Sequence, residues 1–347
     1  MSAIPTPIHQ TVAAIYAAWE AAAGDGLRPH LGASECWDEC MRRQWYGFRW
    51  AETPKWNGQM LRLFDRGKRE ESAVEDDLRR IGCEVWTTDE NGIQWRVETL
   101  GGHFAGSMDG AVRGLPEAPR TWHVLEIKTA NDKSWKELAK KGVKDAQPRH
   151  YAQMQVYMHL TGMKRAAYVS VNKNDDSIYL ERIEHDKDAA EALVERARRI
   201  ITSAEPPPRI NDDPEWFQCK MCRFSGICHG TDAPLVNCRT CAHSTPVLDG
   251  KPGEWRCERG HSLIIDLPKN GCAEHRYIPI LLEKFAEPVD AGDNFVEYRN
   301  RLTGVQFNNG ELASTEIRAC KDKAMLGQER VDPDLKALRE EFGGVYA

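Results

Sequence analysis

The stretch Val124-Leu125-Glu126-Ile127-Lys128-Thr129 is the best guide to the fold of this chain. Polar and aliphatic residues alternate along it, a pattern that predicts a β-strand. Side chains two positions apart on a strand share a face, so Glu126 and Lys128 point one way and Leu125 and Ile127 the other. Taken alone, a Glu-x-Lys pair is most often an ordinary ion pair on a sheet.

A second acid upstream changes that interpretation. Gly106-Ser107-Met108-Asp109-Gly110 predicts a strand end with an acid between glycines. Two neighbouring strands would bring Asp109 beside Glu126, and like charges that close are costly unless a cation lies between them. Carboxylate oxygens with open positions suit Mg²⁺ or Mn²⁺. Such an ion can polarise a phosphodiester, with Lys128 orienting water or offsetting charge on the phosphate.

The hydrophobic periodicity around these strands predicts an α/β domain. Helices are expected at 8–23, 34–50, 57–80, 132–141, 148–160 and 186–204, and strands at 83–87, 93–100, 104–112, 121–129, 166–172 and 177–183. This order predicts a mixed central sheet flanked by helices over about 30–205. The run Pro206-Pro207-Pro208 closes the domain.

In this order, the motifs resemble the PD-(D/E)XK nuclease superfamily, in particular its RecB-like branch. In that branch a Gln-x-x-x-Tyr helix follows the Glu-x-Lys strand, and Gln153 and Tyr157 match it, four apart and so on one helix face. The resemblance covers roughly 32–230. It implies a restriction-endonuclease-like core in which Asp109, Glu126 and Lys128 are catalytic, and in which Gln153 and Tyr157 position the metal site or DNA.

The branch also has an upstream Gly-x-x-x-His/Glu helix. Gly67-Lys68-Arg69-Glu70-Glu71 supplies it, so the resemblance implies Glu71 as a third acidic ligand of Mg²⁺ or Mn²⁺, with Glu70 as the alternative. A solvated carboxylate on a charged helix is the competing interpretation of Glu71.

The chain has 11 cysteines, an odd number, and the reducing compartment expected for it disfavours structural disulfides. In Cys219-x2-Cys222-x5-Cys228 the spacing indicates metal binding. It resembles the CRISPR-associated and AddB-type nucleases and their phage-encoded relatives, in which a distant N-terminal cysteine completes a [4Fe–4S] cluster. Cys40 matches that fourth position, and Cys36 is the alternative. Four cysteines can equally hold zinc.

A second set follows at Cys238, Cys241, Cys257 and Cys272, near His243, His261 and His275. A Cys-x2-Cys pair with two further cysteines indicates a zinc-ribbon or knuckle site. Cys83 and Cys320 are interpreted as ordinary residues.

The net charge of −6 conceals basic stretches: 40–69 holds eight basic and two acidic residues, and 131–150 holds six and three. We expect these stretches to contact phosphates, although solvated helix faces would have the same composition. Trp45, Tyr46, Phe48 and Trp50 lie among the arginines, where they could stack on bases or form core. The N-terminal residues lack the features of a secretory signal and no membrane span is expected, so the predicted location is cytoplasmic.

These observations predict four parts: an N-terminal helix at 1–30, a nuclease domain at 31–230, a zinc-ribbon-like module at 231–280, and a charged, partly helical tail at 281–347. The expected function is metal-dependent cleavage of DNA that is single-stranded or has free ends, by an exonuclease or end-processing enzyme of phage or mobile-element recombination or replication. A strand-annealing recombinase is the expected partner. A non-catalytic DNA-binding scaffold and an iron–sulfur redox protein are the alternatives.

Overall fold

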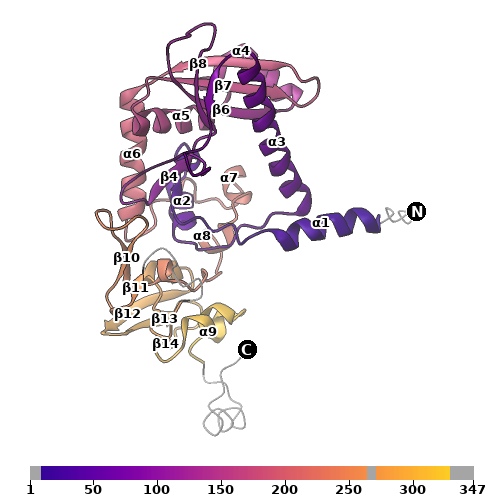
Figure 1. Ribbon diagram of the computed structural model, residues 1–347. Helices are drawn as coiled ribbons and strands as arrows, with labels where there is room; N and C mark the ends of the chain where they lie inside the picture. The colour runs from indigo at the N-terminus through magenta and orange to yellow at the C-terminus, as the bar shows by residue number, and fades with distance from the viewer. Residues whose placement is uncertain (1–8, 264–270, 329–347) are drawn as a thin grey trace, which may run out of the picture. The chain divides into compact units, whose positions relative to one another are not determined.

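The computed structural model describes residues 9–263 and 271–328. The chain divides into two compact units, each of them discontinuous in sequence (Figure 1). Unit 1 comprises Met1–Glu39 and Thr53–Arg199, and unit 2 comprises Cys40–Glu52 and Ile200–Ala347. The short segment 40–52 therefore belongs with the C-terminal part of the chain, which is not the division that the sequence suggested.

Unit 1 is built on a five-stranded mixed sheet, as predicted. Its order is β2 (Glu84–Trp86), β5 (Gly110–Arg113), β6 (His123–Ala130), β7 (Arg165–Asn172) and β8 (Ile178–Glu184). Strands β6 and β7 are parallel and the other pairs are antiparallel. A smaller sheet holds β1 (Leu31–Gly32), β4 (Phe104–Ser107) and β3 (Arg96–Thr99). The predicted strand 104–112 is thus split between two sheets, and Asp109 lies at the break.

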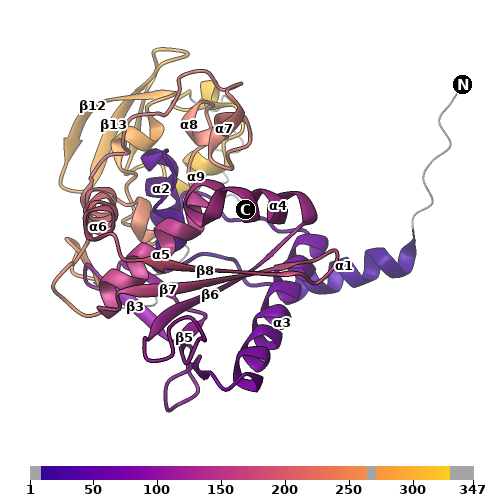
Figure 2. The same cartoon turned by 90° about the horizontal axis from the view of Figure 1, so that it is seen from above.

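Helices cover both faces of the larger sheet. Figure 2 shows α3 (Gly58–Arg80) on one side and α4 (Asp132–Ala146) and α5 (Pro148–Thr161) on the other. Val74 and Leu78 of α3 form a buried core with Leu125 and Ile127 of β6. Because side chains alternate along a strand, Glu126 faces away from that core, toward α5.

Two further helices are α1 (Gln10–Ala22) and α6 (Lys187–Thr202). The first, α1, holds the start of α3 through Glu20, whose carboxylate accepts the Gly58 N–H at 2.7 Å. Asn57 caps α3, since its Oδ1 accepts the Met60 N–H at 2.9 Å. Helix α6 corresponds to the predicted helix 186–204.

The helix predicted at 34–50 does not form as one element. A 3₁₀ turn, η1 (Ala33–Glu35), is followed by α2 (Met41–Phe48), with Cys40 at its N-cap. The chain passes from unit 1 to unit 2 after Glu39. A continuous helix over 34–50 would therefore have to pack into the cores of both units.

Unit 2 carries more β structure than the sequence suggested. The region of the cysteine sets holds short helices, α7 (Phe217–Lys220) and α8 (Ser225–Cys228), a turn η2 (Cys238–Thr240), and a sheet with the order β11 (Ser262–Leu263), β10 (Trp255–Cys257) and β9 (Ser244–Pro246). After η3 (Pro279–Leu282), a third sheet contains β12 (Ala286–Gly292), β13 (Phe295–Asn300) and β14 (Gln306–Asn309), followed by α9 (Ser314–Ala319) and η4 (Lys323–Met325).

The third sheet replaces much of the charged tail predicted from 281 onward. Val296, Tyr298 and Asn300 are buried along β13, whereas the residues between them are more exposed. The charged residues on the exposed face made the strand look like part of a charged tail in the sequence. The sequence also predicts a helix near 334–342 in this tail, and that stretch lies outside the described residues.

The aromatic segment at 45–50 is core. Trp45, Tyr46, Phe48 and Trp50 are at most 4% exposed. The guanidinium of Arg239 lies 3.9 Å from the centre of the Trp50 ring. These aromatic side chains therefore do not stack on bases. Arg42 and Arg49 are also buried, and both donate to backbone carbonyls, Arg42 Nε to Pro207 O. These two arginines therefore do not contact phosphates. Among the described residues, no helix has the length and hydropathy needed to cross a membrane.

Candidate active site and cysteine sets

Asp109 is held at the break between β4 and β5. Gly110 pairs with Leu125, so Asp109 lies beside the next residues of β6. Its Oδ2 accepts the backbone N–H of Ile127 at 2.8 Å, which fixes the carboxylate against the Glu-x-Lys strand. Gly110 permits the close approach of β2 to β5, because a Cβ there would lie 2.8 Å from Trp86 O.

Glu126 and Lys128 share a face of β6, as the alternation predicted. Lys128 Nζ lies 2.6 Å from Glu126 Oε1 and 3.2 Å from Asp109 Oδ2. The pKa of the inaccessible Glu126 is raised to about 7; burial is the main cause, Lys128 opposes the rise, and the charges of Asp109 and Glu71 add to it. Although burial lowers the pKa of Lys128, the two carboxylates more than offset this and hold it above its ordinary range. Lys128 is therefore an ammonium ion between two acids.

Gln153 and Tyr157 support Glu126 from α5. Gln153 Nε2 donates to Glu126 Oε2 at 3.3 Å and to the Tyr157 hydroxyl at 3.0 Å, and that hydroxyl donates to Ser107 O at 2.8 Å. Gly106 makes room for the ring, because a Cβ there would lie 2.7 Å from it. The structure thus joins the Gln-x-x-x-Tyr helix to both acid-bearing strands by one hydrogen-bonded chain.

Glu71, on α3, lies close enough to Asp109 and Lys128 for their charges to affect it. Burial and the Asp109 carboxylate raise the pKa of Glu71 to about 7, while Lys128 opposes that shift. One turn later, Glu75 also responds to Asp109: burial is the main cause of its raised pKa, and its ion pair with Arg79 opposes the rise. Glu75 was not foreseen, although its i, i+4 spacing from Glu71 places both on one helix face.

A family comparison agrees with this geometry. A family model described as the PD-(D/E)XK nuclease superfamily matches residues 6–229. This range includes the six side chains that we call the acidic site: Glu71, Asp109, Glu126, Lys128, Gln153 and Tyr157. The chain belongs to the PD-(D/E)XK nuclease superfamily. Nucleases of this superfamily generally use divalent metal ions, and a set of three carboxylates with one ammonium ion is consistent with that chemistry.

Solved structures resemble the nuclease only in general outline. An alkaline exonuclease from Laribacter hongkongensis is 21% identical with a TM-score of 0.38, over 53% of this chain and 90% of its own. SSO0001 is 18% identical with a TM-score of 0.37, over 63% of this chain and 96% of its own. A phage related exonuclease from Haemophilus somnus 129PT is 20% identical with a TM-score of 0.26, over 38% of this chain and 66% of its own. A search of curated proteins finds no match.

Two further side chains beside the acidic site were missed by sequence reasoning. Tyr168 is the register partner of Glu126 on β7, and its hydroxyl lies 2.8 Å from His150 Nδ1. Burial, with Lys128 contributing, lowers the pKa of His150 to about 3, so the ring is neutral. His150 precedes Gln153 by three residues and Tyr157 by seven, a helical spacing that could have indicated their common face.

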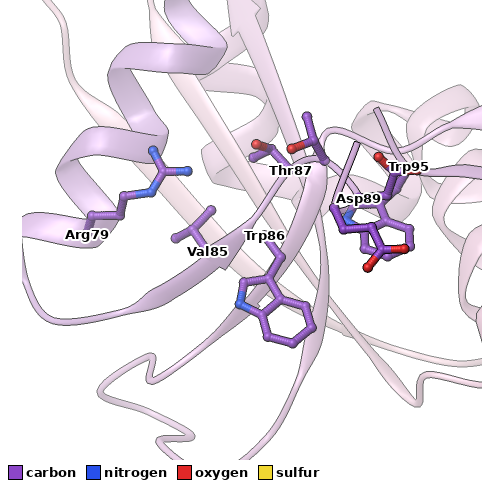
Figure 3. Close-up of a pocket in the computed structure, with 8 residues that line it drawn as sticks. Arg79, Val85, Trp86, Thr87, Asp89 and Trp95 are labelled. Carbon is purple, nitrogen blue, oxygen red and sulfur yellow. The ribbon is translucent and has the colours of Figure 1, made fainter. Parts of the chain in front are cut away.

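The pocket in Figure 3 is separate from these residues. This cavity of about 680 Å³ is lined by Arg79 of α3, by Val85 and Trp86 of β2, and by Thr87, Thr88, Asp89, Glu90 and Trp95. Asp89 Oδ1 accepts the N–H groups of Asn91 and Ile93, so this carboxylate serves to shape its own turn. The cavity contains no member of the acidic site.

The first cysteine set comes together within unit 2. Burial raises the pKa of Cys219 and Cys222, and the charges of Cys40 and Cys228 add to both shifts. Arginines lie nearby: Arg43 lowers the pKa of Cys222, and Arg42 Nη1 approaches Cys228 Sγ at 4.0 Å. Cys36, the alternative ligand, is buried and donates to Ala33 O at 2.8 Å.

The second set also comes together. Burial is the main cause of the raised pKa of Cys238, to about 12, and Cys241, Cys272 and Cys257 add to it in that order. Over residues 9–263 and 271–328 no group of three or more His, Cys, Asp or Glu side chains is arranged to hold a metal ion as it stands. All 11 cysteines are free thiols. Metal binding at any of these sets therefore requires side-chain rotation.

Proposed function

We propose that this nuclease is a Mg²⁺- or Mn²⁺-dependent DNA exonuclease or end-processing enzyme whose active centre is Asp109, Glu126 and Lys128. The observation that carries the proposal is that Asp109 and Glu126 both approach Lys128 Nζ, at 3.2 and 2.6 Å, so that two carboxylates and one ammonium group lie together. Glu71 completes the acidic set.

The donor set fits a divalent ion of the magnesium type. Glu71, Asp109 and Glu126 offer hard oxygen ligands. Burial is the main cause of the raised pKa values of Glu71 and Glu126, and repulsion from Asp109 adds to both, which supports a site that a cation would stabilise. Glu71, Asp109 and Glu126 would hold the ion. When bound, it supplies Lewis-acid polarisation of the phosphodiester and a lowered pKa for the attacking water.

The chain's own residues then have distinct tasks. Lys128 carries its proton, so it donates a hydrogen bond to the water or phosphate and offsets negative charge that develops at phosphorus. The attacking oxygen forms the new P–O bond while the bond to the leaving oxygen breaks, and that oxygen takes up a proton. Gln153 and Tyr157 hold the buried Glu126 in position by their chain of hydrogen bonds.

The first half of α3 is the surface we assign to DNA. Its exposed face carries Met60, Leu63 and Phe64, with Phe64 in edge contact with Trp56. Arg62, Lys68 and Arg69 are exposed on the same helix. Aromatic and basic side chains together grip single strands by stacking on bases and neutralising phosphates, which supports a substrate that is single-stranded or has free ends. The helix leads directly to Glu71.

We also propose that Cys40, Cys219, Cys222 and Cys228 hold a [4Fe–4S] cluster, with zinc as the alternative. Cys40 and Cys228 raise the pKa of Cys219 and Cys222, and arginines lie beside the set. Both observations support a centre that carries negative charge. The resemblance to phage-encoded relatives supports a role in recombination or replication beside a strand-annealing recombinase.

The test is cleavage of end-labelled single- and double-stranded DNA across a titration of Mg²⁺ or Mn²⁺. We expect no cleavage without the metal, and a shortening ladder from free ends with it, faster on single strands. Glu126→Gln is the matched control, since it keeps the shape of the side chain and removes its charge. DNA binding without cleavage at any metal concentration would instead identify a scaffold.

A further inference from the structure

The region that follows the family match, from Thr231 onward, contains tight turns that begin at Cys238, Cys241, Cys257 and Cys272; in the second of these, Ser244 N–H donates to Cys241 O at 3.3 Å. Cys241 N–H donates to Cys238 O at 3.3 Å, Gly260 N–H to Cys257 O at 3.1 Å, and His275 N–H to Cys272 O at 3.0 Å. Gly260 has φ +81°, a conformation that favours glycine. In each turn, the hydrogen bond that closes it joins two backbone groups.

Backbone pairing brings these turns together. Cys257 is opposite Ser244 in the β9–β10 ladder, and Glu258 N–H donates to His243 O at 2.9 Å. On the other side, Cys241 forms a bridge with Tyr277. The segment after Cys241 is therefore flanked by the turns at Cys257 and Cys272.

Side chains secure the turn at Cys272. A Cβ at Gly271 would lie 2.9 Å from Val236 Cγ1, so the residues before Cys272 and Cys238 are in close contact. His275 Nε2 lies 3.2 Å from Thr240 Oγ1, between the two turns. The turns that carry the four cysteines come from three separate segments and are thus held near one another.

The histidines nearby have other partners. Both ring nitrogens of His275 are engaged, with Thr240 Oγ1 and at 2.9 Å with Ser314 Oγ. His243 Nε2 lies 3.1 Å from Asn294 Oδ1, and His261 Nε2 lies 2.9 Å from Glu274 Oε2. The four cysteines therefore remain as the ligand set, as in the prediction from the sequence.

We propose that Cys238, Cys241, Cys257 and Cys272 bind one structural zinc ion. Four thiolates fill a tetrahedral site and leave no open position, so the ion has a structural role. Backbone N–H groups of Arg276 and His243 point to the sulfur of Cys241 and stabilise its anion, opposing the effect of burial. The ion would fix the short β9–β10–β11 sheet, whose Trp255 packs on Arg239.

The experiment uses the full chain, because Arg239 lies against Phe48 and Trp50 and a fragment of this region would lack part of its core. Zinc and iron are counted in the wild type and in Cys272→Ser, Cys219→Ser and Cys320→Ser. We expect Cys272→Ser to lose about one zinc per chain and to keep the metal of the first set. Cys219→Ser should do the reverse, and Cys320→Ser should keep both.

A measurement on the wild type covers the case in which a variant does not fold. Replacing zinc by Co²⁺ should produce intense sulfur-to-cobalt absorption, and a chelator should expose four thiols to a thiol reagent as one ion leaves. An unchanged zinc content in Cys272→Ser, iron in place of zinc at this set, or a cobalt spectrum without sulfur ligation would each overturn the proposal.

Discussion

The carboxylates of the acidic site and the thiols of the two cysteine sets are brought together by different structural features. In unit 1, the carboxylates of Asp109 and Glu126 are already bridged by the Lys128 ammonium ion, and strand register holds them together. In unit 2, segments far apart in sequence bring the thiols together through short turns and bridges. The acidic site should therefore keep its structure without metal, whereas the cysteine-rich region should depend on it.

The largest expected effect is on catalysis in unit 1. Glu126→Gln and Lys128→Ala should each reduce turnover by at least about 100-fold, since these groups act as one unit. Thermal unfolding of Glu126→Gln should change little, because the amide keeps the shape and can still pair with Gln153. Single-turnover cleavage and a melting curve measure the two effects. Wild-type turnover in both variants would show that the active centre lies elsewhere.

The next effect concerns the first cysteine set. Cys40→Ala should abolish the brown colour of anaerobically purified protein, lose about four irons per chain, and lower the melting temperature. Cys36→Ala should keep the iron, because that thiol is engaged with Ala33 O. The reverse pattern would reassign the fourth ligand, and zinc without iron in the anaerobic protein would reject the cluster.

A smaller effect separates the two candidate acids on α3. Glu71→Gln should reduce cleavage at low Mg²⁺ by roughly 10-fold or more, because it removes one charged ligand. Its neighbour provides the control, and Glu70→Gln should behave like the wild type. If Glu70→Gln raises the metal requirement and Glu71→Gln does not, the assignment of the third acid is reversed.

The smallest effect tests the DNA surface on α3. Nothing lies within 4 Å of a Cβ built at Gly67, so the packing does not explain this glycine. Gly67→Ala should stabilise the helix by about 1 kcal/mol. If the DNA backbone passes over this position, the same change should raise KM while kcat stays constant. A higher melting temperature with unchanged KM would remove Gly67 from the DNA path.

The core of unit 1 was predictable because its signals are local. Strand alternation indicated the common face of Glu126 and Lys128, and flanking glycines indicated the acid at Asp109. The larger sheet and the start of α3 at Gly58 agree with these signals. The roles of Tyr168 and His150 were not predictable in this way, because they depend on the register of β7 against β6.

Unit 2 was harder to predict, since its core joins distant segments. Residues 45–50 resemble a basic, aromatic DNA-binding helix until Arg239, far along the chain, is found against the Trp50 ring. The sheet β12–β13–β14 was concealed because charged residues occupy its exposed positions. Periodicity reports which face is buried, but it does not report which partner covers that face.

The most direct test of the account is Mn²⁺ binding followed by electron paramagnetic resonance in the wild type and in Asp109→Asn. Asp109 should hold the ion that cleavage requires, so the variant should lose bound Mn²⁺ and DNA cleavage together while its melting curve and the metal content of its cysteine sets are preserved. Unchanged Mn²⁺ binding and cleavage in Asp109→Asn would contradict the assignment of the acidic site as the nuclease centre.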